Sequence, residues 1–485
     1  MKKTLLIISS LILLSGASCD DFLALEPTES AAAETAINTA ADAGVAINGV
    51  MASMASSYYY GRDFFLYGDV KGGDVTIVSQ GRGRDVLYSF NHSATSNAFG
   101  SFWSQIYYCL LQVNNLLENI SRLEGEGKGS DELDNYKGQA LTLRALMYFD
   151  LARLYGKPYT ENGGASLGVP MPLAVLDVYA KETRKTVAEN YTQILKDLKD
   201  GEALLPEKVS QGYIDYYANK AIQARVYLFM GNTTAALAAA EEIISDNEYA
   251  LYENNKWVDS WSSEFGSESI FELGIYENEA DLGTSSLGYY YMRLRKISGA
   301  DGNFVASTGY ISLLAEDPDD VRHGIMDYDE TSNSRMGACN KYTGNDLKGD
   351  KGSPSAVNIK IIRLSEIYLI AAEAALPTDR DTAAYYLNQI RKRAPNLGKV
   401  TASEVSLDLI LAEKSKEFYS EGLRFFDMMR LGRTVYFDDS LLWPAVIPHR
   451  SGSVDRSFYK AILPIPQAEL DANPAIVSQQ NAGYN

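Results

Sequence analysis

The chain has 485 residues, of which 46% are hydrophobic and 22% charged, and its formal net charge is −19. This apolar content excludes global disorder. The acidic balance argues against nucleic acid as a partner, because phosphate binding requires clustered Lys and Arg side chains. A single compact core stops growing beyond about 250–300 residues, so we expect two subdomains or an elongated repeat array.

Residues 1–18 have the features of a signal peptide. Lys2 and Lys3 precede a short apolar run from residue 5 to residue 17. A helix needs about 20 apolar residues to span a bilayer, so this run is too short to cross one. The sequence SGASC, which ends at Cys19, resembles a bacterial lipoprotein cleavage site, where Cys19 is lipidated and becomes the first residue. Gly16 departs from the usual aliphatic residue, and an ordinary secretory signal followed by a chance cysteine is the alternative.

Cysteine and histidine usage gives no indication of a metal centre or a disulfide scaffold. Once Cys19 is assigned to the lipid, only Cys109 and Cys339 remain, so stability must come from packing. The chain contains three histidines and no CxxC or HExxH motif. We therefore expect no metal and no cofactor.

Residues 134–155 have the spacing of an amphipathic helix. Apolar side chains recur at steps of three and four residues from Leu141 to Tyr155. Gly156 and Pro158 follow and end the helix. Residues 103–117 keep the same steps, so the two segments are predicted to form an antiparallel helical hairpin.

Two later segments, 218–246 and 364–394, place small residues at offsets typical of tetratricopeptide repeats. Small residues at these offsets allow the helices of a hairpin to approach closely. Between the segments lies the irregular stretch 248–357, which is rich in Tyr, Gly, Ser and Asp, and in which 270–275 is the best strand candidate. The predicted fold is mainly α, a tetratricopeptide-like helical-repeat scaffold with an irregular, loop-rich aromatic subdomain.

Six segments, in order along the chain, resemble the SusD/RagB family of outer-membrane nutrient-binding lipoproteins. They are CDDFLALEPTES (19–30), WSQIYYCLLQVNNLLENI (103–120), GQALTLRALMYFDLARLYGKPY (138–159), IRLSEIYLIAAEAAL with LNQIRKRA (362–376 and 387–394), KEFYSEGLRFFDMMRLGR (416–433) and LPIPQAELDANPAIVSQQNAGY (463–484). One departure is AEKSKEF (412–418), where the family usually has an arginine after the glutamate, which weakens one structural ion pair. The resemblance divides the mature chain into an N-terminal part with helical hairpins, an irregular insert that contributes to the ligand surface, and a C-terminal part with helical hairpins. These parts are 19–247, 248–357 and 358–485.

The resemblance implies a surface-exposed lipoprotein, anchored in the outer membrane through Cys19, that acts as a lid on a SusC-like TonB-dependent transporter. It implies the capture of oligosaccharide and its delivery to that transporter. A member that captures oligopeptides and, less favoured, a glycoside hydrolase are the alternatives.

Two segments have the composition of a sugar-binding site, in which exposed aromatic rings pack on sugar C–H faces and short polar side chains bind hydroxyl groups. They are 81–97 and 283–295, the second taken together with Tyr310. The first matches in position the ligand loop of the family's starch-binding member. The predicted ligand-binding residues are Asp74, Arg84, Tyr88, Phe90, Asn91, Tyr289, Tyr290 and Tyr310. The alternative is that these rings pack the subdomains together, and for any single ring that alternative is favoured.

Two carboxylates and an arginine near the C-terminal end form a candidate catalytic site. Glu417, Glu421 and Arg424 are spaced i, i+4 and i+7, which places them on one face of a predicted helix. A glycosidase uses two carboxylates as its acid and base. However, carboxylates four residues apart on a helix lie side by side, with Arg424 poised to neutralise them. We therefore predict a structural ion-pair network and no catalytic residue.

Overall fold

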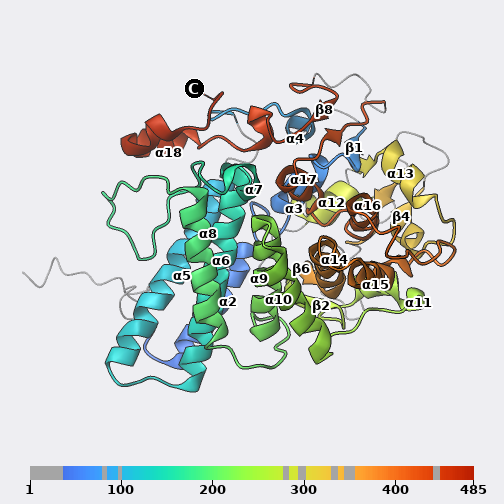
Figure 1. Cartoon of the computed structure of the whole chain (residues 1–485). Coiled ribbons are helices and arrows are strands. Elements are labelled where there is room, and N and C mark those ends of the chain that lie inside the picture. Colours follow the sequence, from blue (N-terminus) through green and yellow to red (C-terminus); the bar gives the residue numbers. More distant parts are fainter. Residues whose placement is uncertain are drawn as a thin grey trace, which may run out of the picture.

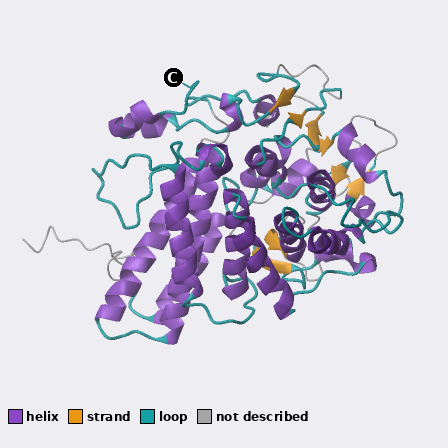
Figure 2. Cartoon of the chain, in the orientation of Figure 1, coloured by secondary structure: helices purple, strands orange, loops and turns teal. Residues whose placement is uncertain are grey.

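The computed structural model describes residues 36–78, 85–96, 101–276, 283–292, 302–328, 337–342, 356–440 and 448–484. Most of these residues lie in helices, with short paired strands between them (Figures 1 and 2). The predicted signal peptide, Cys19 and Arg84 lie outside the described residues. No helix in the described part of the chain is both long enough and apolar enough to span a membrane.

Four helices form the N-terminal layer, in which α2 packs on α5, α5 on α6 and α6 on α8 (Figure 1). Their bounds are Ala40–Met54 (α2), Ser101–Gly125 (α5), Asp131–Tyr155 (α6) and Val187–Glu202 (α8). Helix α6 begins after Ser130, whose side chain accepts a hydrogen bond from the Leu133 backbone N–H at 3.2 Å, and it ends at Gly156. The helical hairpin predicted from the apolar spacing is confirmed.

A second group of helices continues the stack. Its bounds are Tyr216–Met230 (α9), Thr233–Asp246 (α10), Leu364–Ala375 (α14), Arg380–Arg391 (α15) and Leu407–Glu417 (α16). Gly231, at φ +75°, makes the tight turn between α9 and α10. The small residues Ala236, Ala372 and Ala384 are buried, and α10 packs directly on α14. The tetratricopeptide-like scaffold is therefore confirmed, with its two separated segments side by side.

Paired strands connect the irregular stretch to this scaffold, and in the described part of the chain each sheet has two antiparallel strands. The pairs are β1 (Val75–Ile77) with β3 (Phe304–Ala306), β2 (Ser269–Leu273) with β6 (Ile359–Arg363), β4 (Met326–Asp327) with β5 (Ala338–Cys339), and β7 (Val435–Tyr436) with β8 (Ser453–Val454). Strand β2 confirms the strand predicted at 270–275. The remaining short helices are α3 (Asp63–Val70), α4 (Asp85–Ser89), α7 (Tyr159–Asn162), α11 (Asn254–Trp257), α12 (Leu287–Tyr291), α13 (Thr308–Leu314), α17 (Arg424–Arg430) and α18 (Gln467–Ala472).

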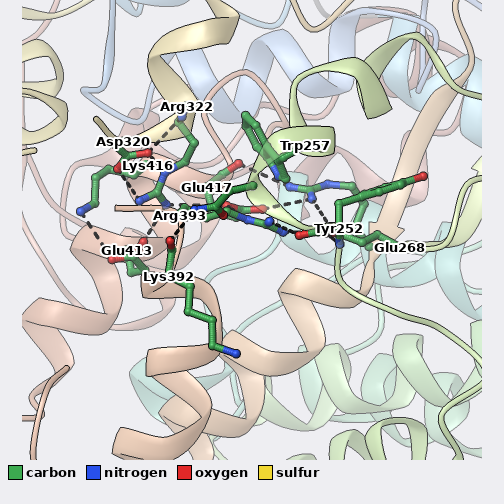
Figure 3. A network of polar contacts seen from close by, with 12 residues as sticks. Tyr252, Trp257, Glu268, Asp320, Arg322, Lys392, Arg393, Glu413, Lys416 and Glu417 are labelled. Atoms are coloured by element: carbon green, nitrogen blue, oxygen red, sulfur yellow. Dashed lines mark hydrogen bonds and ion pairs between the residues drawn. The ribbon is translucent and has the colours of Figure 1, made fainter. Parts of the chain in front are cut away.

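A buried network of charged side chains joins the strands to the C-terminal helices. The Arg363 guanidinium lies 2.9 Å from a Glu268 carboxylate oxygen, 3.1 Å from Glu417 and 2.8 Å from Glu421, and all four side chains are buried. Figure 3 shows how the network continues through Arg393, which lies 2.7 Å from Glu268. Buried charges are tolerated only when they are paired in this way.

The predicted helix face carrying Glu417, Glu421 and Arg424 is wrong, although the ion pairing of the two carboxylates is confirmed. Helix α16 ends at Glu417, and Ser420 has φ +66°, so Glu421 lies beyond the helix. Arg424 points elsewhere, with its Nε atom 3.4 Å from Asp74 Oδ2. The charges of the two glutamates are instead compensated by Arg363, an arginine that local spacing could not identify.

The lysine that replaces the family's usual arginine is also paired. Lys414 Nζ lies 2.7 Å from Glu373 Oε2 and 3.2 Å from Asp427 Oδ2. The lysine thus keeps two carboxylate partners, although it lacks the fork geometry of a guanidinium.

Candidate ligand-binding surface

The chain just before the first predicted segment pairs with residues that follow the second segment. Strand β1 pairs with β3 in the register Val75 to Ala306, and the Ser307 backbone N–H donates to the Asp74 carbonyl oxygen at 2.8 Å. Just beyond the strands, the Val78 N–H donates to the Asn303 carbonyl oxygen at 3.1 Å. Residues 74–78, just before the first segment, therefore lie beside residues 303–307, and a ligand surface shared by the two segments themselves stays a prediction.

Asp74 lies at the edge of this junction and is held by side chains from the C-terminal part. Ser415 Oγ donates to Asp74 Oδ2 at 2.5 Å, and Arg424 Nε lies 3.4 Å from the same oxygen. The Asp74 side chain remains 16% exposed, so a ligand can still reach its carboxylate.

Tyr88 is fully buried, and protein groups already occupy both its ring and its hydroxyl. The hydroxyl lies 2.8 Å from the Asp438 carbonyl oxygen and 2.8 Å from Asp439 Oδ1. The Arg450 guanidinium lies over the ring, 4.6 Å from its centroid. This is a cation–π contact, which leaves that face of the ring no room for a sugar.

Phe90 is also fully buried, at a backbone φ of +58° that side-chain-bearing residues seldom adopt. Its ring packs against Phe425, Phe437 and Phe458, with centroid distances of 5.7–6.3 Å. The ammonium group of Lys71 lies 4.1 Å from the ring centroid.

Lys71 is itself buried and contacts His92, with 3.0 Å between Nζ and Nε2. Burial, with a smaller repulsion from Lys460, lowers the pKa of Lys71 well below its ordinary value. Burial likewise lowers the pKa of His92, and the Lys71 charge adds to that effect.

The aromatic residues of the second segment are buried as well. The rings of Tyr289 and Tyr290 meet edge to face at 5.1 Å, and the Arg62 guanidinium lies 5.6 Å from the Tyr290 centroid. Tyr310 stacks on Tyr419 with 4.2 Å between ring centroids. Exposed fractions of 6% for Tyr289 and Tyr290 and 1% for Tyr310 show that these rings belong to the core.

The expectation of exposed rings is therefore wrong for the five aromatic residues predicted to bind ligand. Packing between subdomains, the alternative weighed for each ring, describes what these side chains do in the structure. The reason is that tyrosine tolerates burial when its hydroxyl finds a partner. Buried tyrosines of the irregular stretch find such partners elsewhere in the chain, as when Tyr291 Oη donates to Asp69 Oδ2 of α3 at 2.7 Å.

Two accessible residues remain beside this junction. Asn91 was predicted and is exposed. Tyr436 was missed, although it is 73% exposed and its carbonyl oxygen lies against Gly73, where an added Cβ would approach it to 2.7 Å. Alternation in the segment VYF (435–437), with Val435 buried and Tyr436 exposed, is the signal that could have identified it.

Two observations concern metal binding and the carboxylate pair considered for catalysis. Among the described residues, no group of three His, Cys, Asp or Glu side chains could hold a metal ion. Glu417 and Glu421, the carboxylates weighed for acid/base chemistry, are buried beside Arg363 and away from solvent.

Comparison with known proteins identifies the family. The model of the SusD family matches residues 324–484, and a second model, described as starch-binding associating with outer membrane, matches residues 21–228. A crystal structure of a SusD superfamily protein from Bacteroides vulgatus aligns with a TM-score of 0.84 at 34% sequence identity, covering 93% of this chain and 100% of that one. The chain belongs to the SusD family.

Curated relatives of this SusD-family chain extend over most of its length. SusD-like protein P2 of Formosa agariphila is 24% identical, with 98% of each chain covered. The starch-binding protein SusD of Bacteroides thetaiotaomicron is also 24% identical, and the alignment covers 82% of this chain and 81% of that protein. The mainly helical, tetratricopeptide-like architecture is thus the architecture of the family.

Proposed function

We propose that this chain is a cell-surface lipoprotein that captures oligosaccharide and delivers it to a SusC-like TonB-dependent transporter, acting as the transporter's lid. The observation that carries the proposal is the full-length similarity to the SusD superfamily, at 34% identity to one solved structure. The name of the starch-binding relative and the description of the N-terminal family model support carbohydrate as the ligand and the outer membrane as the location.

We propose that the capture surface includes Asp74, Asn91 and Tyr436, which all keep exposed side-chain surface. An exposed tyrosine ring offers a flat apolar face to a sugar, and the carboxylate and amide accept and donate hydrogen bonds to hydroxyl groups. The chain neighbours of Tyr436 and Asn91 are in contact, because the Phe437 ring packs on Phe90 with 5.8 Å between centroids.

The other predicted contacts remain proposals, and the buried ones require the segments that cover their rings to move when ligand binds. These residues are Arg84, Tyr88, Phe90, Tyr289, Tyr290 and Tyr310.

Replacing Tyr436 tests this surface. Tyr436→Ala should weaken oligosaccharide binding about 5- to 10-fold, because one stacking contact contributes about 1 kcal/mol, while the unfolding midpoint stays within experimental error of wild type. Tyr385→Ala is the matched control, since Tyr385 is 58% exposed but lies on α15. Equal binding by both variants would place the capture surface elsewhere.

Delivery requires contact with the transporter. Native membranes solubilised in mild detergent should yield a TonB-dependent transporter together with this chain, because a lid needs a large and stable interface. Recovery of the chain without any such transporter would argue against the lid role.

Capture is proposed to be non-covalent. The carboxylate pair weighed for glycoside hydrolysis is buried and neutralised by Arg363, so it cannot flank a glycosidic bond in this conformation. Turnover of oligosaccharide by the purified chain, lost in Glu417→Gln, would favour the hydrolase alternative. Retention of oligopeptides in place of sugars would favour peptide capture.

A further inference from the structure

A cleft of about 510 Å³ lies between the first turns of α5, the 170–182 segment and α18. In Figure 1, α18 lies above the upper end of α5, with the loop that contains the 170–182 segment beside it. Small-molecule sites typically measure about 300–1,000 Å³, so the cleft has room for a ligand of several sugar units.

Hydrogen bonds between segments distant in sequence hold the walls of the cleft in place. Tyr107 Oη donates to the Pro170 carbonyl oxygen at 2.7 Å, which fixes the loop against α5. Lys181 Nζ donates to the Ala472 carbonyl oxygen at 2.6 Å, which fixes the same loop against the end of α18. The cleft is therefore formed without a ligand, which lowers the entropic cost of binding.

One side of the cleft is apolar and aromatic. The rings of Trp103 and Tyr107 lie with their centroids 4.9 Å apart, and Trp103 Nε1 donates to Glu469 Oε2 at 3.2 Å, which sets the orientation of the indole. Leu176 and Val178 also line the cleft, and they are 40% and 85% exposed.

The cleft is also lined by Asn473, whose buried side-chain oxygen receives no hydrogen bond from the described residues. Asn473 is 6% exposed and lines the cleft. Its Nδ2 donates to the Glu182 carbonyl oxygen at 2.7 Å and to Glu469 Oε1 at 3.2 Å. No described residue donates a hydrogen bond to its Oδ1. A buried acceptor of this kind is costly unless a donor from outside the chain reaches it.

We propose that this cleft binds a sugar unit of a neutral oligosaccharide, as a second binding site apart from the surface around Asp74. A sugar ring presents apolar C–H groups to the rings and aliphatic side chains, and a hydroxyl group donates to Asn473 Oδ1 once a small shift of the Asn473 side chain exposes that enclosed atom. The carboxylates of Glu182 and Glu469 line the cleft with one lysine, Lys181, so an anionic ligand is disfavoured. The proposal rests on oligosaccharide capture, the proposed function, and adds a site to it.

The test is calorimetric titration of the full chain with maltopentaose, laminaripentaose, cellopentaose and xylopentaose. We expect two binding events with at least one of these sugars. Asn473→Ala should weaken one event about tenfold through loss of the acceptor, and Val178→Asp should weaken the same event about fivefold through loss of apolar contact. Tyr436→Ala should weaken the other event.

Val175→Asp is the matched control, because Val175 is 40% exposed in the same loop but does not line the cleft. Since Val178 is 85% exposed, its replacement leaves folding intact even where Asn473→Ala does not. A single binding event that is weakened only by Tyr436→Ala would overturn the proposal of a sugar site in the cleft and leave the proposed function standing. Binding of none of the four sugars would count against both, and binding of a lysine-rich pentapeptide at the cleft in their place would overturn the sugar assignment.

Discussion

Truncating Phe90 distinguishes a core aromatic residue from a ligand contact. Its side chain is fully buried against three phenylalanine rings and beneath the Lys71 ammonium group. Removing a buried phenylalanine ring typically costs about 3–5 kcal/mol through lost burial and the cavity left behind. We therefore expect Phe90→Ala to lower the free energy of unfolding by that amount.

The backbone at Phe90 provides a second and independent expectation. Because φ is +58°, alanine at this position keeps the strain of a left-handed conformation, whereas glycine does not. Phe90→Gly should therefore be about 1 kcal/mol more stable than Phe90→Ala, the reverse of the usual order of these two residues. Helix and strand positions show the opposite preference.

Urea unfolding followed by tryptophan fluorescence measures both variants, with the exposed Tyr385→Ala as the control that should unfold with wild type. A Phe90→Ala variant that unfolds at the wild-type urea concentration but loses oligosaccharide binding would refute the packing argument. It would show that the ring faces ligand in solution.

Three further predictions concern the charged core and the anchor. Arg363→Met removes the guanidinium that contacts Glu268, Glu417 and Glu421, so it should destabilise the chain by about 3–5 kcal/mol in urea unfolding, and an unchanged midpoint would contradict the network. Burial alone would raise the pKa of Glu417, but Arg363 and its neighbouring arginines outweigh it and lower that pKa from 4.5 to about 2. The ionised Glu417 therefore stabilises the fold above pH 4.5, and about 3 kcal/mol should be lost between pH 4.5 and pH 2. The Glu417→Gln variant should lose less free energy of unfolding than wild type over that pH range. Identical pH profiles of stability in variant and wild type would contradict the assignment of this loss to Glu417. Cys19→Ala should leave the membrane fraction in cells that lack the transporter, and persistence there would refute the lipid anchor.

The scaffold was predictable because its signals are local. Apolar periodicity with Gly156 and Pro158 after it located the end of α6. The small residues around Ala236 and Ala372 located the two hairpins, which pack together because each buries the face that the other leaves open.

The binding surface was less predictable because an aromatic-rich composition is typical of both a sugar site and a buried core. Tyrosines interleaved with short polar residues are typical of a solvent-exposed sugar site. They are equally typical of a core in which tyrosine hydroxyl groups bind buried carboxylates. Tyr291, whose hydroxyl donates to the buried Asp69, is of the second kind, and Tyr88 is buried with its hydroxyl on the half-buried Asp439. Only the tertiary structure shows which partner each hydroxyl finds.

Contacts between distant parts of the chain determine the remaining ion pairs and hydrogen bonds, which sequence spacing did not predict. Glu421 pairs with Arg363 and Lys341, which it reaches because the chain leaves α16 and turns at Ser420. In the same way, Trp103 donates to Glu469, which lies far from it in the sequence. No spacing rule within one segment identifies such pairs.

Oligosaccharide capture is tested most directly by offering the purified full chain a mixture of neutral oligosaccharides and oligopeptides of equal size and concentration. Mass spectrometry then identifies what the protein retains after rapid gel filtration. We predict that oligosaccharides are retained and oligopeptides are not, and that retention falls in Tyr436→Ala. Retention of oligopeptides alone, at the same level in wild type and in Tyr436→Ala, would contradict the proposed function.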